Sequence, residues 1–474
     1  MGSINTGFNI ATGALEADQA ALNVVANNVA NANTTGYTRE VPNFQTADSV
    51  VIGSAIYGDG VTMTGGVSQR NPVLQQSLDQ QTQAESASAA RLTALNQVQS
   101  IFSSATSAGS NASTTGGTVG ISQDMASFFN AMSALEAGPS DTALRQQVLS
   151  SAGNLATDFN SASQQLTSEQ LTLNQQSGSL LDSINGLTAN IAQLNAQIGS
   201  LGTSGDAGSL QDARATDIAK LGALIGVNQI QTENNGLTLT TTSGALLVSG
   251  SQSFALSTGS VSGMTHFFDA NGNDITSGLM SGGGQLGGLL TVRDQDIPQM
   301  QSSLDTLAYS LGSAINAQNA AGTDANGNPG GAIFSLPAIS AGAAAQISVV
   351  MTNPSLIAAA AAGDGSQNGS NAQAMAGIAS QSIAGGVTPG NYYSDFVTSL
   401  GSLVSEVHSQ NAAQQASVTQ LTNQVGAISG VSLNEEAASM QTLEQAYQAA
   451  SKVFTIISNV ELAALNLGVG TTYA

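Results

Sequence analysis

The residue types that most often carry catalysis are scarce in this sequence and lie far apart. The histidines are His266, in a segment with strand-like patterning, and His408, in a helical segment. A histidine acts as a general acid or base when a nucleophile and an orienting group lie beside it, and neither histidine has such neighbours in the sequence. The motifs H-E-x-x-H, G-x-x-x-x-G-K-[ST] and G-x-S-x-G do not occur either. We therefore predict no catalytic residues and do not expect an enzyme.

A glycine-rich segment matches the phosphate-binding pattern G-x-G-x-x-G. It runs from Gly282 to Gly287, and a helix is expected from about Ile297. In dinucleotide-binding folds this pattern follows a buried strand. Here Asn271 to Gly278 reads as a polar turn, so that context is missing and we expect no cofactor.

Two acidic turns share the sequence D-A-N-G-N and resemble the start of a calcium loop. They begin at Asp269 and Asp324. Both lack the glycine at the sixth position and the glutamate at the twelfth that an EF-hand requires. Asn-Gly turns between strands explain them better, and we predict no metal site.

The charge balance limits the possible partners. The 474 residues include 8 Lys and Arg against 30 Asp and Glu, a formal net charge of −22. The basic residues are scattered, so there is no basic patch to neutralise phosphates, and neither nucleic acid nor an anionic membrane is an expected partner. Cysteine is absent, which excludes disulfides and thiolate sites.

Hydropathy argues against membrane insertion and against a cleaved signal. No window reaches about 18 consecutive apolar residues, the length at which a membrane-spanning helix becomes a candidate. Met1 to Ala11 has neither a basic start nor a compact apolar stretch, so we expect no cleaved signal peptide.

Apolar residues spaced three and four apart predict long helices with a coiled-coil-like seam. One run is interrupted only by Ser177, and a second has consecutive polar seam positions at Asn411 and Gln414. We expect the two runs to pack as antiparallel partners. The first contains Leu173, Leu180, Ile184, Leu187, Ile191, Leu194, Ile198 and Leu201, and the second Val397, Leu400, Val404, Val407, Val418, Leu421, Val425 and Ile428.

Both ends of the chain also carry amphipathic stripes. The first includes Phe8, Leu15, Leu22, Val25 and Val29, and the last includes Met440, Leu443, Tyr447, Phe454 and Ile457. A second stripe on the last helix consists of Val453, Ile456, Val460 and Ala463. Amphipathic helices usually face the core of their own subunit, and that interpretation stays open. The second stripe favours the alternative, in which the last helix has more than one neighbour.

Strand signals appear between the helical runs. Residues Val227 to Ser257 alternate apolar and polar types, with turn signals at Asn235-Gly236 and Ser249-Gly250, and Thr323 to Met351 is also β-leaning. The linkers predicted from composition are Ala105 to Gly120, Gly199 to Gly208 and Ala358 to Ala374. The expected fold class is mainly α with a small β domain.

Both chain ends carry longer motifs. Residues Ala26 to Arg39 read ANNVANANTTGYTR, and Gly430 to Ala437 read GVSLNEEA, followed by QAYQA and KV. These segments resemble the terminal signatures of the flagellar rod, hook and hook-associated axial proteins. The signature residues are Asn27, Asn28, Asn31, Asn33, Gly36, Tyr37, Glu435, Glu436, Ala446 and Tyr447.

The middle of the chain resembles the hook-associated members that form the junction between hook and filament. The similarity includes Phe128-Phe129, Pro139 to Asp141, and Ile191 to Asn195. Residues Gln211 to Asp217 follow the family's acidic-Arg-acidic helix only loosely. The resemblance covers most of the chain.

The resemblance implies a non-catalytic structural protein of the bacterial flagellum, exported through the type III apparatus without signal cleavage. Its partners would be further copies in an axial ring, the hook protein below, a second junction protein or the filament above, and an export chaperone. The axial assembly interface would then be the two terminal stripes, Phe8 to Val29 and Met440 to Ile457. The alternatives are another axial protein of the hook or filament type and, more distantly, a secreted adhesin or hydrolase.

The expected domains follow the same division. Residues 1–45 would pair with residues 431–474 as the terminal coiled coil. Residues 60–225 and 375–430, with a helix at 285–320, would form the helical domain, and 226–284 with 321–360 an inserted β-rich outer domain.

Overall fold

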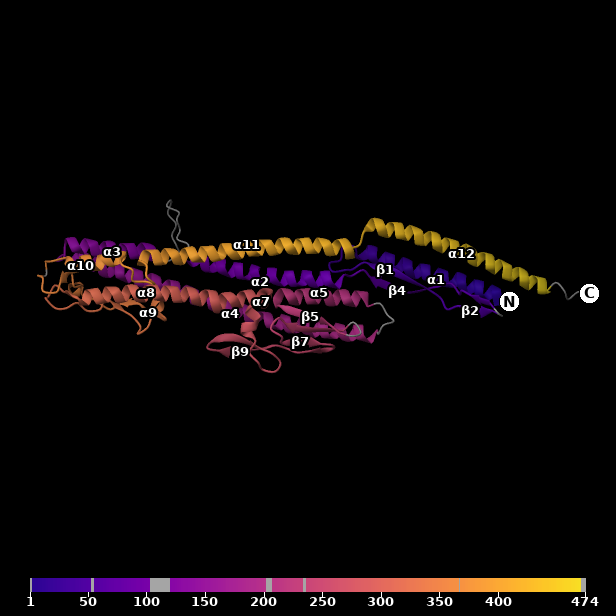
Figure 1. Cartoon of the computed structure of the whole chain (residues 1–474), viewed down its shortest axis with the longest axis horizontal. Helices are drawn as coiled ribbons and strands as arrows, with labels where there is room; N and C mark the ends of the chain where they lie inside the picture. Colours follow the sequence, from indigo (N-terminus) through magenta and orange to yellow (C-terminus); the bar gives the residue numbers. More distant parts are fainter. Residues whose placement is uncertain are drawn as a thin grey trace, which may run out of the picture.

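The computed structural model describes residues 2–52, 55–102, 120–201, 207–232, 236–365 and 367–469. The molecule is elongated, with its long helices nearly aligned with its longest axis (Figure 1). Of the predicted linkers and turns, residues 105–119, residues 202–206, Asn235 and Ser366 lie outside the described residues. None of the described helices is long and apolar enough to span a membrane.

The two chain ends form a separate arm at one end of the molecule. Helices α1 (Gly2–Asn31) and α12 (Leu433–Val469) lie side by side. They are antiparallel, because Phe8 contacts Phe454 with ring centroids 4.5 Å apart while Asn28 contacts Glu436 near the other end. The predicted pairing of the terminal helices is thus confirmed. We call α1, α12 and the strands between Glu40 and Ser68 the terminal unit.

Strands β1 (Glu40–Thr46) and β4 (Val61–Ser68) form an antiparallel ribbon against the side of α1 away from α12. A second hairpin, β2 (Val50–Ile52) with β3 (Ala55–Tyr57), extends from this ribbon. The sequence interpretation assigned residues from 60 onward to the helical domain, and that assignment is wrong for β4. Valine and threonine alternate there, which favours a strand packed on one face of a helix.

The central body contains α2 (Pro72–Phe102) and α11 (Pro389–Ser429) as an antiparallel pair. Phe102 contacts Phe396 at one end, with ring centroids 5.0 Å apart. In the middle, the Asn411 side chain donates to the Ser88 hydroxyl over 3.0 Å. The predicted pairing of residues 397–428 with 173–201 is therefore wrong. The polar positions in α11 find polar partners on α2, which the mainly apolar seam of the other run does not offer.

Helix α4 (Thr142–Ser200) is the longest element, with 59 residues. Its seam residues Leu173, Ile184, Ile191 and Ile198 are buried, as the spacing predicts. Ser177 interrupts the seam without leaving an unmet donor, because its hydroxyl donates to the carbonyl of Leu173. The first half of α4 packs with α3 (Ile121–Ala137) and α8 (Ile297–Ala320), and the second half with α5 (Gly208–Leu224).

A four-stranded antiparallel sheet covers the second half of α4 in the strand order 5-6-7-8. Its strands are β5 (Val227–Gln231), β6 (Leu237–Thr241), β7 (Leu246–Ser249) and β8 (Gln252–Ser253). A hairpin follows, β9 (Ser257–Val261) with β10 (Met264–Phe268). The β segment predicted after Val227 is confirmed.

The second predicted β segment belongs to a different part of the molecule. Residues 321–360 contain strands of only two residues each, and Ile333, Phe334, Ile347 and Ile357 are buried in the cluster formed by α3, α4 and α8. The sheet lies in a separate cluster. The single β-rich outer domain expected from 226–284 and 321–360 is therefore not formed, because apolar side chains draw the second segment into the helical core. The short elements there are β11 (Gly322–Thr323), β12 (Phe334–Ser335), α9 (Ala343–Gln346), β13 (Ser348–Val349), η2 (Pro354–Leu356) and β14 (Ala360–Ala361), followed by α10 (Ser370–Gly377) and η3 (Ile378–Ser380).

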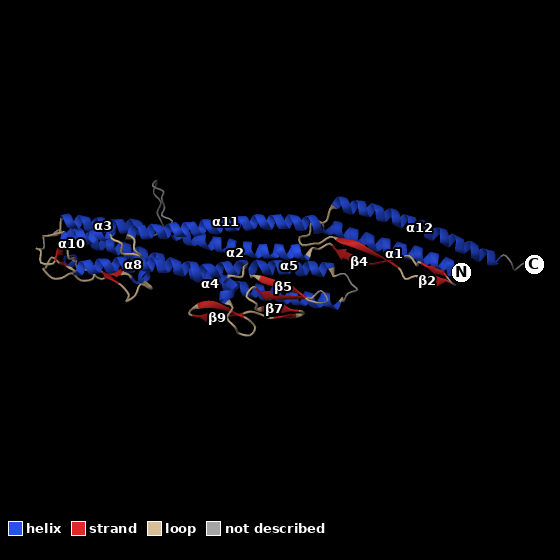
Figure 2. Ribbon diagram, in the orientation of Figure 1, coloured by secondary structure: helices blue, strands red, loops and turns tan. Residues whose placement is uncertain are grey.

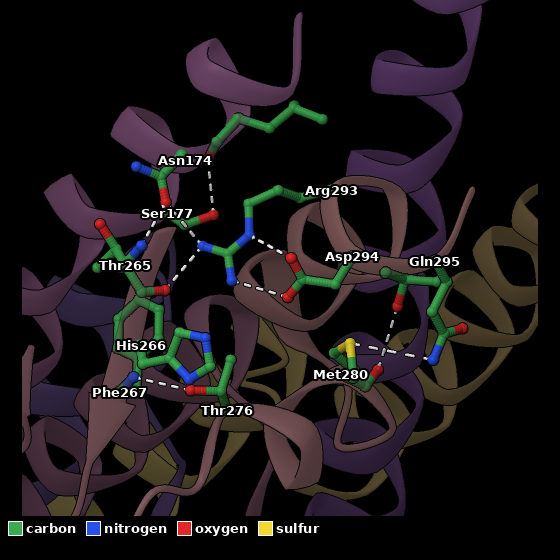
Figure 3. A network of polar contacts seen from close by, with 12 residues as sticks. Asn174, Ser177, Thr265, His266, Phe267, Thr276, Met280, Arg293, Asp294 and Gln295 are labelled. Carbon is green, nitrogen blue, oxygen red and sulfur yellow. Dashed lines mark hydrogen bonds and ion pairs between the residues drawn. The ribbon is translucent and has the colours of Figure 1, made fainter. Parts of the chain in front are cut away.

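A buried arginine joins the β9–β10 hairpin to the helical body (Figure 3). Arg293 lies in a π-helical segment, η1 (Val292–Asp296), and its side chain is fully buried. Its guanidinium forms two bonds of 2.7 Å to Asp294 and donates to Asn174 Oδ1 on α4 and to the carbonyl of Thr265. Every contact satisfies a donor that burial would otherwise make costly.

The glycine-rich segment is a packing device. Helix α6 (Thr276–Met280) precedes it, and α7 (Gly284–Thr291) lies directly against α2. A β-carbon at Gly288 would overlap the carbonyl oxygen of Ala87, and one at Gly284 would lie 2.5 Å from the nitrogen of Ile225. These glycines therefore allow backbones to approach closely.

This packing predicts opposite effects for two glycine substitutions within helices. Gly288→Ala should destabilise the protein by about 1–3 kcal/mol, the usual cost of overpacking. Gly186→Ala should stabilise it by about 1 kcal/mol, because a β-carbon there meets nothing within 4 Å and alanine favours the helix. Urea unfolding followed by circular dichroism measures both. Equal shifts of the same sign would contradict the close approach of α7 to α2.

One half-buried carboxyl predicts a pH effect. Burial, and next the charge of Asp124, raise the pKa of Asp158 to about 6. A carboxyl whose pKa rises on folding stabilises the fold while protonated, so its contribution is lost as pH rises from about 4 through 6. The thermal midpoint of Asp158→Asn should therefore exceed that of the wild type increasingly up to about pH 7. Asp182→Asn, an exposed change on the same helix, should show no such trend.

Candidate assembly interface

The described residues offer little for catalysis. His266 pairs with Asp274 at the surface over 2.6 Å, and His408 is exposed on α11. The carboxylate of Asp269 accepts bonds from the backbone of Asn271 and Asn273, as an Asx turn does. Within the described ranges, His, Asp and Glu side chains form no group of three that could hold a metal ion. Most of the signature residues gather instead at the base of the terminal unit.

The centre of that base is the buried side chain of Asn28. Its amide nitrogen donates to the carbonyl of Glu40 over 2.7 Å and to Glu436 Oε2 over 3.0 Å. Its oxygen accepts from the Tyr37 hydroxyl over 2.8 Å and from the backbone nitrogen of Glu40 over 3.0 Å. All four bonding positions of the amide are filled, and one side chain joins α1, β1 and α12.

Arg39 is the second residue that binds the start of α12. Its guanidinium pairs with Glu436 over 2.6 Å and with Glu435 over 2.7 Å. Its backbone nitrogen donates to the carbonyl of Ser429 at the end of α11 over 2.9 Å. We call Asn28, Tyr37, Arg39, Glu435 and Glu436 the terminal latch. Charge-assisted bonds of this kind are stronger than neutral ones, so the latch fixes where α12 begins.

A second network connects the terminal unit to the body through α5. Asp212 accepts from the backbone nitrogen of Thr38 over 2.8 Å and pairs with Arg70. Burial lowers the pKa of Arg70, so its cation depends on carboxylates such as Asp212 and Asp79 nearby. Gly36 has a φ of +82°, and a β-carbon there would lie 2.6 Å from Thr216 Oγ1 on α5. A side chain at position 36 would therefore disturb both the turn and the contact with α5.

The remaining signature residues have lesser roles or lie apart. The Asn31 side chain donates to Asn27, and Asn27 donates to the Tyr37 hydroxyl over 3.4 Å. Asn33 is exposed, and no hydrogen bond of its side chain occurs among the described residues. Ala446 and Tyr447 are exposed farther along α12, away from the latch.

The residues predicted as the axial interface mostly face one another within the same chain. On α1, Val25 is buried and Phe8, Leu15 and Leu22 are half-buried, whereas Val29 is exposed. On α12 the half-buried residues are Met440, Leu443, Phe454 and Ile457, and Tyr447 is exposed. These stripes therefore form the seam between α1 and α12, so most of their surface is used inside one subunit.

The free apolar surface comes from other side chains. The second stripe of α12 is exposed at Val453, Ile456 and Val460, as are Leu462 and Leu465. The sequence pattern identified this stripe. It missed the exposed apolar residues of the β2–β3 hairpin, because that hairpin was not predicted. It also missed the roles of Arg39 and Asp212, whose partners lie far away in the sequence.

Comparison with known proteins agrees with this architecture. Residues 107–334 match the family described as "Flagellar hook-associated protein FlgK helical domain", and residues 8–38 match "Flagella basal body rod protein". Flagellar hook-associated protein 1 of Escherichia coli K12 is 24% identical over 97% of this chain and 99% of its own length. Its counterpart in Bacillus subtilis 168 is 26% identical over 99% of this chain and 100% of its own.

A solved structure shares the fold. The flagellar hook junction protein FlgK from Burkholderia pseudomallei superposes on 75% of this chain and on all of its own, with a TM-score of 0.66 and 19% sequence identity. That likeness concerns the fold, since the two sequences differ at most positions.

The latch predicts which signature asparagine matters for the arm. Asn28→Ala removes the bonds of this side chain to Glu40, Tyr37 and Glu436 and should cost the terminal unit about 2–3 kcal/mol. Hydrogen exchange should then accelerate in α1 and α12 but not in α4. Asn33→Ala is the matched control and should leave every rate unchanged. Equal protection of α1 in both variants would show that the latch does not hold the unit.

Proposed function

This chain belongs to the flagellar hook-associated protein 1 family, and we propose that it acts at the junction between hook and filament. It is a structural component of the bacterial flagellum that joins the hook to the filament. The observation that carries this role is the terminal unit, a narrow arm in which two antiparallel helices leave an apolar stripe exposed along the outer side of α12.

The physical argument begins with the size of the arm. Among the described elements α12 packs mainly on α1, and its outward side exposes Val453, Ile456 and Val460. An exposed apolar stripe of this kind marks a surface that becomes buried in an assembly. The latch and the Asp212 network hold the arm at a defined angle to the body, which a subunit of a regular array needs.

The junction role implies particular partners. We place the hook protein below the ring of subunits and a second junction protein or the filament above it, with an export chaperone bound before assembly. The terminal stripes named above would shape the arm, and the predicted division into terminal unit and helical domain would separate axial contacts from the outer body.

Another axial protein of the hook or filament type is the main alternative. It would share the terminal signatures, but the long α4 and the match of residues 107–334 to the helical domain favour the hook-associated type. A secreted adhesin or hydrolase has no specific support among the described residues.

Disrupting the outer stripe should block assembly without unfolding the subunit. Ile456 is 61% exposed, so Ile456→Asp should leave the circular dichroism of the purified protein unchanged. In a strain lacking its own copy, this variant should give hooks without filaments and abolish swimming. Ile339→Asp is the control, since Ile339 is 66% exposed near α9 at the other end of the molecule. Normal swimming with Ile456→Asp would argue against the assembly role of α12.

A further inference from the structure

We propose that the terminal unit binds a second copy of the chain, with the outer stripe of α12 in one copy packed on the β2–β3 hairpin of the next. The proposal rests on the proposed function, because it names the partner of the same assembly surface. It depends on the exposure of these two faces, on their positions along α1 and on the charges beside them.

The hairpin is the second uncovered face. Val51 lies opposite Ile56 in the register of β2 and β3, and the two residues are 66% and 73% exposed. Tyr57 beside them is also exposed. An isolated two-stranded hairpin is at best marginally stable in water, so a covering partner would stabilise it. The outer stripe of α12 offers β-branched residues of similar size at Val453, Ile456 and Val460.

Helix α12 and the β2–β3 hairpin lie on opposite sides of α1 (Figure 2). On one side, Phe454 contacts Phe8, and a β-carbon at Gly7 would lie 3.2 Å from Ile457. On the other side, a β-carbon at Gly60 would lie 3.2 Å from the Cα of Ile10. Copies standing side by side with parallel axes would therefore bring the outer stripe of one level with the hairpin of the next.

A contact between two different faces is heterologous. Each copy then uses one face and offers the other, so subunits add in one direction and form a ring or a helix, not a closed pair. That geometry is the one an axial structure requires.

Charge complementarity supports this orientation. Residues 1–68 and 431–474 contain two basic residues, Arg39 and Lys452, and Arg39 is engaged in the latch. Lys452 is exposed one helical turn before Ile456, on the same side of α12. Asp48 and Asp59 flank the hairpin and are brought near each other by the bond from Ala47 N to the carbonyl of Gly60. Asp48 is exposed, so its carboxylate is accessible to a lysine from a neighbouring copy.

Engineered disulfides test the contact, because the natural chain contains no cysteine. The variant carrying both Ile56→Cys and Ile456→Cys, assembled on hooks in a strain lacking its own copy, should give a ladder of dimers, trimers and larger species after mild oxidation. Each single variant should remain monomeric, since its thiol faces a surface without one. A variant with Ile339→Cys and Ile456→Cys controls for random collision.

Different results would overturn the proposed contact and the junction role. Dimers from Ile456→Cys alone would mean that α12 faces α12 of the next copy, which overturns the proposal. Cells that swim while the double variant stays unlinked would also overturn it and leave the junction role standing. Filaments on hooks of cells lacking the protein would overturn the junction role itself.

A charge exchange provides the second measurement. Adding Lys452→Asp to the double cysteine variant should lower the yield of linked species about fivefold, the effect of one exposed ion pair. Adding Asp48→Lys to that variant should restore the yield. An unchanged yield in both would overturn the orientation inferred from charge.

Discussion

One buried asparagine connects the two ends of the chain, and the terminal unit depends on it. Asn28 bonds to Glu436 across 408 positions of sequence while also holding both backbone groups of Glu40. A buried amide with all its bonds made is stable, but one that lacks a partner is costly, so the side chain specifies a single register between α1 and α12. An apolar residue at this position could slide along the seam, whereas four directed bonds cannot. The stripes supply the attraction between the helices, and the latch determines their alignment.

Most of the arginines likewise bond to groups within the subunit. The chain has few basic residues, and its arginines satisfy internal partners instead of covering the surface. Arg91 forms two bonds of 2.9 Å to Asp296, joining α2 to the start of α8. Arg145 donates to the carbonyls of Pro139 and Ile357, which anchors the irregular segment near η2 to α4. Arg293 does the same for the β9–β10 hairpin. Burial at these places requires hydrogen bonds rather than mere neutralisation, and the planar guanidinium supplies several donors at once.

Features that depend on spacing along one helix could be predicted from the sequence. The seam of α4, most of each terminal stripe and the outer stripe of α12 follow from periods of three and four residues, although the seam position Leu201 and the stripe positions Val29 and Tyr447 are exposed. Choice of partner could not be predicted in this way. Helix α11 packs on α2, where the Asn411 side chain donates to the Ser88 hydroxyl, and a hydrophobic pattern does not indicate which of several helices offers a matching hydroxyl. The glycines at the start of α7 and within it were ambiguous for a similar reason, since close approach to another backbone and to a phosphate require the same absence of a side chain.

The sequence predictions also failed for segments in which apolar residues do not alternate between a buried and an exposed side. Residues 321–360 look β-leaning because they are rich in small and branched side chains, yet these enter a helical cluster from loops. The β2–β3 hairpin carries its apolar pair toward solvent, the reverse of the usual pattern for a strand in a single subunit. Such a reversal is costly for a monomer and has a physical reason only if the pair becomes covered. Residues 321–360 are thus completed by the helical core of the same chain, whereas the β2–β3 pair is the one that the proposed contact with another copy would cover.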